Sequence, residues 1–459
     1  MAIILFKRAS RLTNDIGFTL RTRAELEALE EQALAPYANK SRDKHLTRQF
    51  KEDEHPYRTA YQRDRDRIIH SRAFRRLKHK RQVFLTTESD HYRTRITHTL
   101  EVAQLAGTMA RALGLNEDLV EAIALGHDLG HTPFGHLGEV ILNEIMTGKR
   151  LFLEQKGVRN FGGFKHNYQS VRVVDELERK YAFKGLNLTA PVREGLLKHT
   201  SLKRGKFAFP DFRYEGLDFE RDVCLTIEGQ VVAICDEIAQ RTHDLEDGLR
   251  AGLVSIDRAR ELSIVKKIDR ELDIGEVAGR DPDLYHNLFI RGLINLFVDD
   301  VLKVSLINLS DFAKRKDRLS EFDEELVHFS KNLDPLQKEL NKFIYKEIIH
   351  YSRVKWSDEL GEKLLFRLFE AYYLYPEILP DYLLENELNI QPCTLADGSE
   401  EKTKLVARLR QDPGFFRTVC DYIAGMTDHY ALREAERLAQ MDKFKIDDLK
   451  LDSALGKLV

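Results

Sequence analysis

Cysteines are few in this chain, and long hydrophobic runs are missing. The 459 residues include four cysteines, Cys224, Cys235, Cys393 and Cys420, and none of them belongs to a CxxC pair. Such sparse usage predicts a reduced compartment and argues against a zinc ribbon. No apolar run approaches the ~20 residues of a membrane span, and MAIILF at the start is too short for a signal peptide. The sequence therefore predicts a cytoplasmic protein with no membrane partner.

Glycine-rich phosphate loops and internal repeats are also missing. The sequence contains no GxGxxG motif and no P-loop, which argues against the dinucleotide-binding and Walker-type sites built on them. No repeat is evident, so a solenoid is not expected. The composition, 42% hydrophobic and 32% charged, is that of a globular protein, and the length allows two or three domains.

Hydrophobic residues recur mostly at helical spacing, so the predicted fold class is all-α. Helices are expected over 21–37, 58–81, 95–113, 116–130, 159–181 and 228–252, from near His136, and after 251 with interruptions near Pro376, Pro380, Pro392 and Pro413. A loop or short hairpin is expected over 200–220. The predicted organisation is an N-terminal arm (1–50), a core (51–250) and a helical C-terminal region (251–459) that completes the core and supplies an oligomer interface.

Basic residues crowd into the segment 58–81, which carries ten Lys or Arg against two Asp although the net charge of the chain is −3. Ile69, Ala73 and Leu77 recur at helical spacing, so the basic groups are expected on the other faces of one helix. Such a face can bind a polyphosphate or a nucleic-acid backbone. The alternative is an ordinary solvated face.

Four of the sixteen histidines lie in the segment 95–139: His98, His127, His131 and His136, with Asp128 and Glu139 among them. Unpaired polar groups are costly to bury, so their presence on apolar helices needs an explanation. His98 and His127 lie on the apolar stripes of two helices joined by a short link, in which Gly114 ends the first helix and Asn116 caps the second. One such histidine alone is more often a satisfied core residue.

Together, these groups predict a metal site. Asp128 directly follows His127 and can reach the same ion, and this donor set suits Mn, Fe, Co, Ni, Zn or Mg. A fourth ligand is expected to be a carboxylate from a distant helix. Asp236 is the candidate, because it lies on the polar face of 228–252 with Gln240, His243, Asp244 and Asp247. A solvated polar face is the alternative there.

A zinc-protease motif is the competing interpretation of His127 and His131, which are four residues apart on one helical face. That motif needs a glutamate after the first histidine to act as the base, and this chain has Asp128, whose side chain is shorter. The protease interpretation is therefore disfavoured.

The series His98, His127-Asp128 and Asp236 resembles the H…HD…D signature of the HD phosphohydrolase superfamily. Further segments resemble its dGTP triphosphohydrolase (dNTPase) branch, over roughly 40 to 435: RIIHSRAFRRLKHKRQVF, HTLEVAQLA, ALGHDLGHTPFGHLGE, FKHNYQSVR, DEIAQRTHDLEDGL and VCDYIAGMTDHYAL. The resemblance implies that 51–250 is an HD-domain catalytic core. It also implies a helical C-terminal extension.

The resemblance implies roles for individual residues. One divalent metal ion per subunit, Mn²⁺, Mg²⁺ or a similar transition metal, would be bound by His98, His127, Asp128 and Asp236. The catalytic groups would be His136 and Glu139 as a pair, with His131 and His166 near the phosphates. The substrate-binding groups would be Arg95 at a phosphate, Gln82 and Asp244 at the deoxyribose 3′-hydroxyl, and Asn167 in the same block as His166. Gln240 stands where many members have a tyrosine against the sugar.

The activity implied is hydrolysis of deoxynucleoside triphosphates, dGTP or other dNTPs, to a deoxynucleoside and inorganic triphosphate. A homo-oligomer, tetramer or hexamer, would carry a dNTP effector at a subunit interface, and Arg72, Arg75, Arg76 and Lys78 could bind triphosphate or that effector. One alternative is another HD-type phosphohydrolase, a nucleotidase or phosphodiesterase. The other is a nucleic-acid-binding protein with a vestigial HD site, for which single-stranded DNA is the candidate partner.

Overall fold

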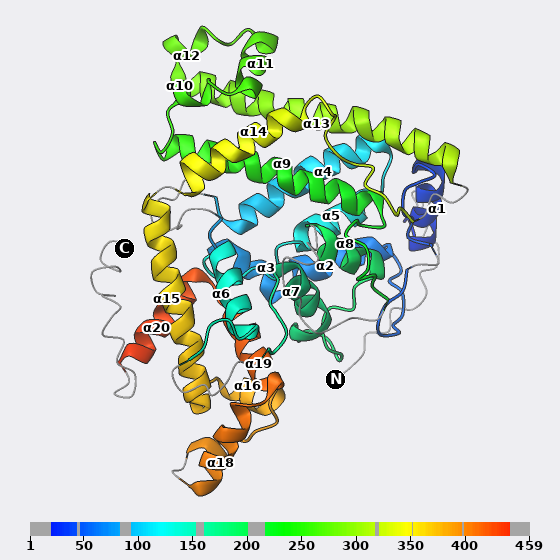
Figure 1. The fold of residues 1–459 in the computed structure, drawn as a ribbon. Coiled ribbons are helices and arrows are strands. Elements are labelled where there is room, and N and C mark those ends of the chain that lie inside the picture. Colours follow the sequence, from blue (N-terminus) through cyan, green and yellow to red (C-terminus); the bar gives the residue numbers. More distant parts are fainter. Residues whose placement is uncertain are drawn as a thin grey trace.

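Helices dominate the computed structural model, which describes residues 20–43, 46–82, 93–152, 160–200, 216–316, 321–350, 352–396 and 399–440 (Figure 1). Within these ranges there is no strand, only an isolated bridge between Arg81 and Thr94. The predicted all-α fold class is confirmed. None of the helices described is long and apolar enough to cross a membrane.

A first hydrophobic core holds the helices that position the candidate site: α2 (Ala60–Ile69), α4 (Arg95–Leu113), α5 (Glu117–Gly126), α7 (His166–Arg172), α8 (Ala190–Lys198) and α9 (Ile227–Arg250). The predicted apolar stripe of α4 is buried, from Val102 to Leu113. Gly114 adopts a left-handed conformation (φ +68°), and the side chain of Asn116 accepts a hydrogen bond from the Leu119 backbone N–H. The two end signals are therefore confirmed.

Five further helices extend this first core above α9 in Figure 1: α10 (Ile256–Ala259), α11 (Ser263–Leu272), α12 (Val277–Arg280), α13 (Pro282–Arg315) and α14 (Asp334–Ile344). The long helix α13 packs on both α4 and α9. The hydrophobic core therefore continues across residue 250, where the sequence analysis placed a domain boundary. That boundary stays a prediction.

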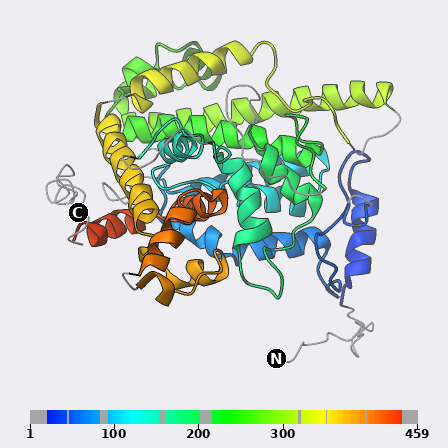
Figure 2. The same cartoon turned by 60° about the horizontal axis from the view of Figure 1, so that its bottom comes forward.

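A second hydrophobic core lies at the other end of the molecule, around α15 (Ser352–Leu374), α19 (Pro413–Ala424) and α20 (Asp428–Ala439) (Figures 1 and 2). Helix α6 (His136–Met146) also packs there, through Ile141, Leu142 and Ile145. Shorter elements complete the chain: α1 (Arg23–Ala33), α3 (Arg72–Arg76), η1 (Leu77–His79), η2 (Val173–Leu177), η3 (Tyr345–Ile349), η4 (Pro376–Ile378), α16 (Asp381–Asn386), α17 (Cys393–Ala396) and α18 (Glu400–Leu409). The four prolines predicted to interrupt helices lie at or just before helix starts.

The described part of the N-terminal arm packs on its own chain. Helix α1 ends before Pro36, as predicted. The Tyr37 hydroxyl donates to the Leu113 carbonyl at 2.8 Å, and the Asn39 backbone N–H donates to the buried Glu228 carboxylate at 2.8 Å. These contacts fix the arm against the ends of α4 and α9.

The segment 58–81 is not the single helix predicted. Helix α2 ends at Ile69, and the Ser71 hydroxyl accepts from the Phe74 backbone N–H to start α3. Nor do all its basic groups face solvent. Arg67 and Lys80 are buried, whereas Arg72 and its exposed neighbours Arg75, Arg76 and Lys78 are not.

Two other predicted helices are shorter than expected. Helix α5 ends at Gly126 instead of near Gly130, because Ser170 of α7 inserts beside the chain: its hydroxyl donates to the His127 carbonyl and accepts from the Gly130 N–H. The helix predicted over 159–181 begins only at His166, after Gly162 with φ +74°, and its π-helical end stops at Leu177. Most of the predicted loop 200–220 lies outside the described residues.

Candidate metal and phosphate site

Four predicted metal ligands meet where α4, α9 and the turn after α5 come together. One donor atom from each of His98, His127 and Asp128 lies within 4.8 Å of the others, and all three residues are buried. From α9, Asp236 places its Oδ1 atom 3.0 Å from His98 Nε2 and 3.7 Å from His127 Nε2. The structure thus brings the remote carboxylate to the cluster, as the sequence predicted.

The tautomer of His127 is set by the backbone. Its Nδ1–H donates to the Ala124 carbonyl at 2.7 Å, which leaves a lone pair on Nε2. That nitrogen is buried, has no hydrogen-bond partner among the described residues, and lies 3.4 Å from Asp128 Oδ1. A lone pair and two carboxylates facing one another fit a divalent cation, and a carbonyl-held imidazole is the usual support of such a ligand.

The electrostatic balance favours ionised carboxylates. Burial opposes ionisation of Asp128, but His131, His127 and Arg95 hold its pKa well below the usual range. For Asp236, burial is likewise outweighed, because the adjacent His98 and His127 lower its pKa. Both acids are therefore charged and ready to bind a cation at neutral pH.

Arg95 lies in the first turn of α4, three residues before His98. Its Nη1 donates to Asp128 Oδ2 at 2.7 Å, which places the guanidinium at the edge of the cation cluster. Its Nε atom is buried and has no acceptor within the described part of the chain. A donor left unsatisfied at this place suits an anionic ligand such as phosphate.

His131, His166 and Glu139 form a second, mostly buried group beside the cluster. The His131 and His166 rings stack with centroids 4.0 Å apart, and His131 Nε2 lies 3.0 Å from Asp128 Oδ1. Glu139 pairs closely with His166 Nδ1 and also accepts from the His166 backbone N–H at 3.0 Å. Burial opposes the ionisation of Glu139, yet the charge and hydrogen bond of His166 lower its pKa.

His136 is the exposed member of the predicted His136–Glu139 pair. Its side chain is 74% exposed, and its Nδ1 lies 4.0 Å from Glu139 Oε1. The close partner of Glu139 is instead His166 of α7. His136 is accessible from solvent, and Glu139 beside it is buried and paired. An accessible imidazole in this setting can exchange protons with a bound ligand.

The remaining predicted substrate-binding residues occupy different environments. Asp244 is buried, and burial together with Asp247 and Asp236 raises its pKa to about 8. Gln82 has a buried Oε1 atom that accepts no hydrogen bond from the residues described, whereas Gln240 is exposed one turn after Asp236. Asn167 uses its amide within the protein, donating to the Leu197 carbonyl at 2.7 Å and accepting from the Tyr168 N–H.

The sequence analysis gave no role to His199, which ends α8. Its Nδ1–H donates to the Leu196 carbonyl at 2.8 Å, and its Nε2 lies 3.2 Å from His166 Nε2. Burial, with the nearby His127 and His166, lowers the pKa of His199 to about 3. The helix before it also carries Arg193, Glu194 and Lys198, so no distinct signal in the sequence singled out this histidine. His243, which contacts His98 from behind, and Glu101, which contacts His243, were also given no role.

Comparisons with known proteins agree with this architecture. The family described as HD domain matches residues 95–241, and the phosphohydrolase-associated domain matches residues 327–437. The first match contains the four candidate ligands, and the second covers most of the helices of the second core. The fold and the cluster define an HD-domain phosphohydrolase.

Relatives narrow this class. The deoxyguanosinetriphosphate triphosphohydrolase-like protein of Geobacter sulfurreducens is 38% identical over 418 residues, covering 90% of this chain and 97% of the relative. The deoxyguanosinetriphosphate triphosphohydrolase-like protein 1 of Mesorhizobium japonicum is 41% identical over 440 residues, covering 92% of this chain and 96% of the relative. A Brucella canis relative of the same description is 41% identical over 408 residues, covering 84% and 91%. The chain belongs to the deoxyguanosinetriphosphate triphosphohydrolase-like family.

Proposed function

We propose that the protein hydrolyses dNTPs, dGTP or others, to a deoxynucleoside and intact inorganic triphosphate. The observation that carries the proposal is the meeting of two groups at Asp128. One carboxylate oxygen faces His127 and His131, and the other accepts from Arg95, so cation-binding and anion-binding groups share one buried centre. The names of the relatives support the substrate class.

His98, His127, Asp128 and Asp236 would hold one divalent ion, Mn²⁺, Mg²⁺ or a similar transition metal, which would act as a Lewis acid and orient a water molecule. Arg95 would bind an oxygen of the α-phosphate and offset its charge. In our proposal His131 and His166 line the phosphates, and Glu139 keeps His166 oriented. His136, at the surface, would exchange a proton with the substrate, since an imidazole does so near neutral pH.

Product analysis tests this assignment. Purified protein is incubated with each dNTP alone and in pairs, with Mg²⁺ or Mn²⁺, and the products are separated. We expect a deoxynucleoside and unbroken triphosphate in equal amounts, and no turnover by Asp128→Ala. Release of orthophosphate or pyrophosphate would instead assign the chain to another branch of HD phosphohydrolases, a nucleotidase or a phosphodiesterase.

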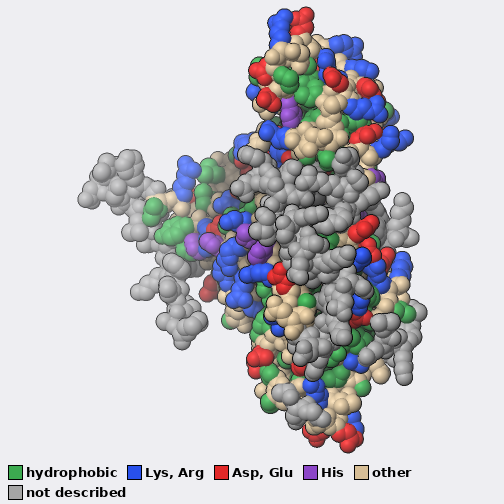
Figure 3. All heavy atoms as spheres, turned by 90° about the vertical axis from the view of Figure 1, so that its left-hand side faces the viewer, with side chains coloured by type: hydrophobic (Ala, Val, Ile, Leu, Met, Phe, Trp, Pro, Cys, Tyr) green, Lys and Arg blue, Asp and Glu red, His purple; other side chains and the backbone are tan. Residues whose placement is uncertain are grey.

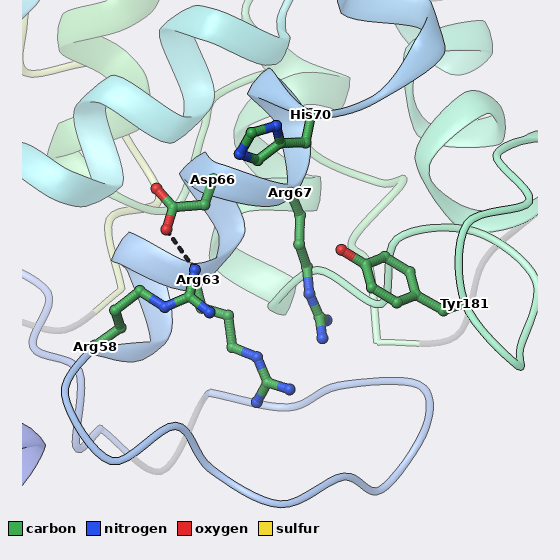
Figure 4. Close-up of a pocket in the computed structure, with 6 residues that line it drawn as sticks. All are labelled: Arg58, Arg63, Asp66, Arg67, His70 and Tyr181. Atoms are coloured by element: carbon green, nitrogen blue, oxygen red, sulfur yellow. Dashed lines mark hydrogen bonds and ion pairs between the residues drawn. The ribbon is translucent and has the colours of Figure 1, made fainter. Parts of the chain in front are cut away.

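We also propose that a dNTP effector binds away from this centre. A cavity of about 270 Å³ lies beside α2 (Figure 4), lined by Arg58, Arg63, Asp66, Arg67, His70 and Tyr181. Asp66 pairs with Arg58, and Glu52 pairs with both Arg63 and Arg67, which leaves a net positive lining suited to phosphate. A homo-oligomer, tetramer or hexamer, would bring further groups to it. Turnover only in dNTP mixtures, abolished by Arg58→Glu, would support this effector site.

Single-stranded DNA is a second candidate ligand, for the exposed basic residues of α3 and η1. Figure 3 shows Lys and Arg side chains gathered with histidines on the face at the left of Figure 1. Arg72 and Arg76 lie near Tyr382, whose side chain is 55% exposed, and aromatic rings beside cations suit unpaired bases. Salt-sensitive DNA binding, weakened by Arg72→Glu but retained by Asp128→Ala, would support this ligand. We propose that the protein acts in the cytoplasm, where nucleotides and DNA are both available.

A further inference from the structure

A chain of polar groups continues behind His98, on the side away from the other candidate ligands. His98 Nδ1 lies 3.2 Å from His243 Nδ1, and the rings are nearly perpendicular, with centroids 5.3 Å apart. His243 Nε2 lies 2.5 Å from Glu101 Oε2. Glu101 comes from the same helix as His98, one turn later, so the chain runs from α4 to α9 and back. His243 meets His98 at Nδ1, whereas Asp236 meets the other ring nitrogen, Nε2.

The series of polar groups behind His98 ends at Glu101, which is held as an anion. Arg93 donates from Nε to the second oxygen of Glu101 at 3.1 Å, and from Nη1 to Asp247 at 2.8 Å. Burial opposes the ionisation of Glu101, but His243 and Arg93 hold the pKa of this carboxyl at about 2. The carboxylate can therefore only accept from His243 Nε2–H.

The direction of every hydrogen bond follows from that anion. With its proton on Nε2, a neutral His243 has a lone pair on Nδ1, which must accept from His98 Nδ1–H. The proton of His98 is then held at Nδ1, and its Nε2 lone pair faces Asp236 Oδ1, 3.0 Å away. Two acceptors in contact need a cation between them. The opposite direction would set His243 Nε2 as an acceptor against Glu101, or would need a second proton on the His243 ring.

We propose that Glu101 and His243 are positioning residues that hold His98 in the tautomer able to bind a metal ion. This inference rests on the proposed metal-dependent function. Glu101 selects the tautomer, and His243 carries that selection across the interface between α4 and α9 and also fixes the angle of the His98 ring. An outer partner of this kind typically contributes about 10–100-fold to metal affinity.

The deciding variant is Glu101→Gln, which keeps size and removes charge. The amide can turn its NH₂ toward His243 Nε2. The direction of the hydrogen bonds then reverses, so that His98 carries its proton on Nε2 and faces Asp236 as a donor. A carboxylate-to-amide change behind a catalytic histidine acts through such a wrong tautomer. Glu246→Gln is the matched control, because Glu246 also pairs with Arg93 but contacts neither histidine.

Mn²⁺ affinity is measured without nucleotide, from the electron paramagnetic resonance signal of free Mn²⁺, and Co²⁺-loaded protein is compared by visible absorption. We expect Glu101→Gln and His243→Phe to weaken Mn²⁺ binding by about 10–100-fold, and Glu101→Gln to change the Co²⁺ spectrum at saturation. Glu246→Gln should match the wild type in both. Thermal unfolding in EDTA verifies that each variant is folded.

The outcomes separate this inference from the proposed function. Wild-type affinity and spectrum in Glu101→Gln would overturn the positioning role while leaving the triphosphohydrolase proposal intact. A wild type that binds Mn²⁺ and hydrolyses no dNTP would overturn the proposed reaction. Weaker Mn²⁺ binding by Glu101→Gln would then still support the positioning role. An equal loss in Glu246→Gln would assign the effect to Arg93 and contradict the role of the two residues.

Discussion

Asp128 is the residue on which the candidate site depends most directly. Its carboxylate faces two histidines and accepts from Arg95, and its neighbour His127 has a lone pair fixed by the Ala124 carbonyl. Asp128, His127 and Arg95 are buried and His131 is mostly buried, so bulk water stabilises these groups little. The Asp128 carboxylate and the His127 lone pair are acceptors that face each other, and burying them without a positive charge between them is costly.

The fourth ligand is tested by removing it. Asp236→Asn keeps the shape of the side chain but removes the anion that faces His98 and His127. We expect Mn²⁺ affinity to fall by more than about 100-fold, since loss of even an outer partner costs about 10–100-fold. Isothermal titration with Mn²⁺ measures it. Glu237→Gln, which alters an exposed carboxylate paired only with Arg241 in the described structure, should bind as wild type.

Lys80 predicts a pH dependence of stability. Burial, with the positive charge of Arg76, lowers its pKa from 10.5 to about 7. Between these pH values the unfolded chain binds a proton at Lys80 that the folded chain has lost. The free energy of unfolding is therefore highest above pH 10.5 and falls as the pH is lowered toward 7. Relative to Lys80→Met, wild-type unfolding free energy should rise with pH by up to about 1.4 kcal/mol per unit. Urea unfolding at pH 7, 8 and 9 measures this, and parallel pH profiles would contradict it.

At the scale of elements, the close approach of α7 to the turn after α5 creates the site. A Cβ atom at Gly130 would lie 2.2 Å from the His166 carbonyl oxygen and 2.2 Å from the Ser170 nitrogen. Only a glycine lets α7 come near enough for His166 to stack on His131. The same contact ends α5 early.

Gly130→Ala should push α7 away from the turn. We expect a loss of about 1–3 kcal/mol in unfolding free energy, as in other overpacked sites, together with loss of activity as His166 moves. Gly107→Ala on α4 is the control, because its Cβ would have no atom nearer than 4.0 Å. That helical substitution should stabilise the protein by about 0.5–1 kcal/mol. Equal effects in chemical denaturation would contradict the account.

Helix ends that depend on neighbouring residues could be predicted from the sequence, whereas features that depend on distant residues could not. The ends of α4 and α5 follow from Gly114 and Asn116, which act through their own backbone neighbourhood. The early end of α5 depends on Ser170, which bonds His127 across 43 residues of sequence, and no periodicity reports such a contact. Asp236 could be chosen from its amphipathic helix, whereas the bond between Glu139 and His166 needed the fold. His199 and His243 were visible as residues but not as neighbours of the site.

At the scale of the whole molecule, the two hydrophobic cores meet at the segment that carries the site. Helix α6 begins with His136 and buries its apolar face against the C-terminal helices. Asp428, at the start of α20, accepts from the Arg81 N–H at 2.8 Å and from the Phe134 N–H at 2.9 Å. The C-terminal region is therefore part of what holds the candidate site in place.

Asp428→Ala tests that coupling. Two buried backbone donors would lose a charged acceptor, and each such bond contributes about 1.5–3 kcal/mol, so we expect a loss of about 3 kcal/mol or more. Activity should fall as well, because Phe134 directly precedes the turn into α6. Glu400→Ala, which removes an exposed carboxylate paired with Lys404, should change neither the denaturation midpoint nor the rate.

The central claim concerns which bond breaks, and an isotope decides it. If water attacks the α-phosphorus, hydrolysis of a dNTP in H₂¹⁸O must place one ¹⁸O atom in the released triphosphate, while the deoxynucleoside keeps its own 5′-oxygen. Mass spectrometry of both products measures this directly. The account predicts singly labelled, intact triphosphate and an unlabelled deoxynucleoside. Label in orthophosphate, in pyrophosphate or in the deoxynucleoside would contradict it.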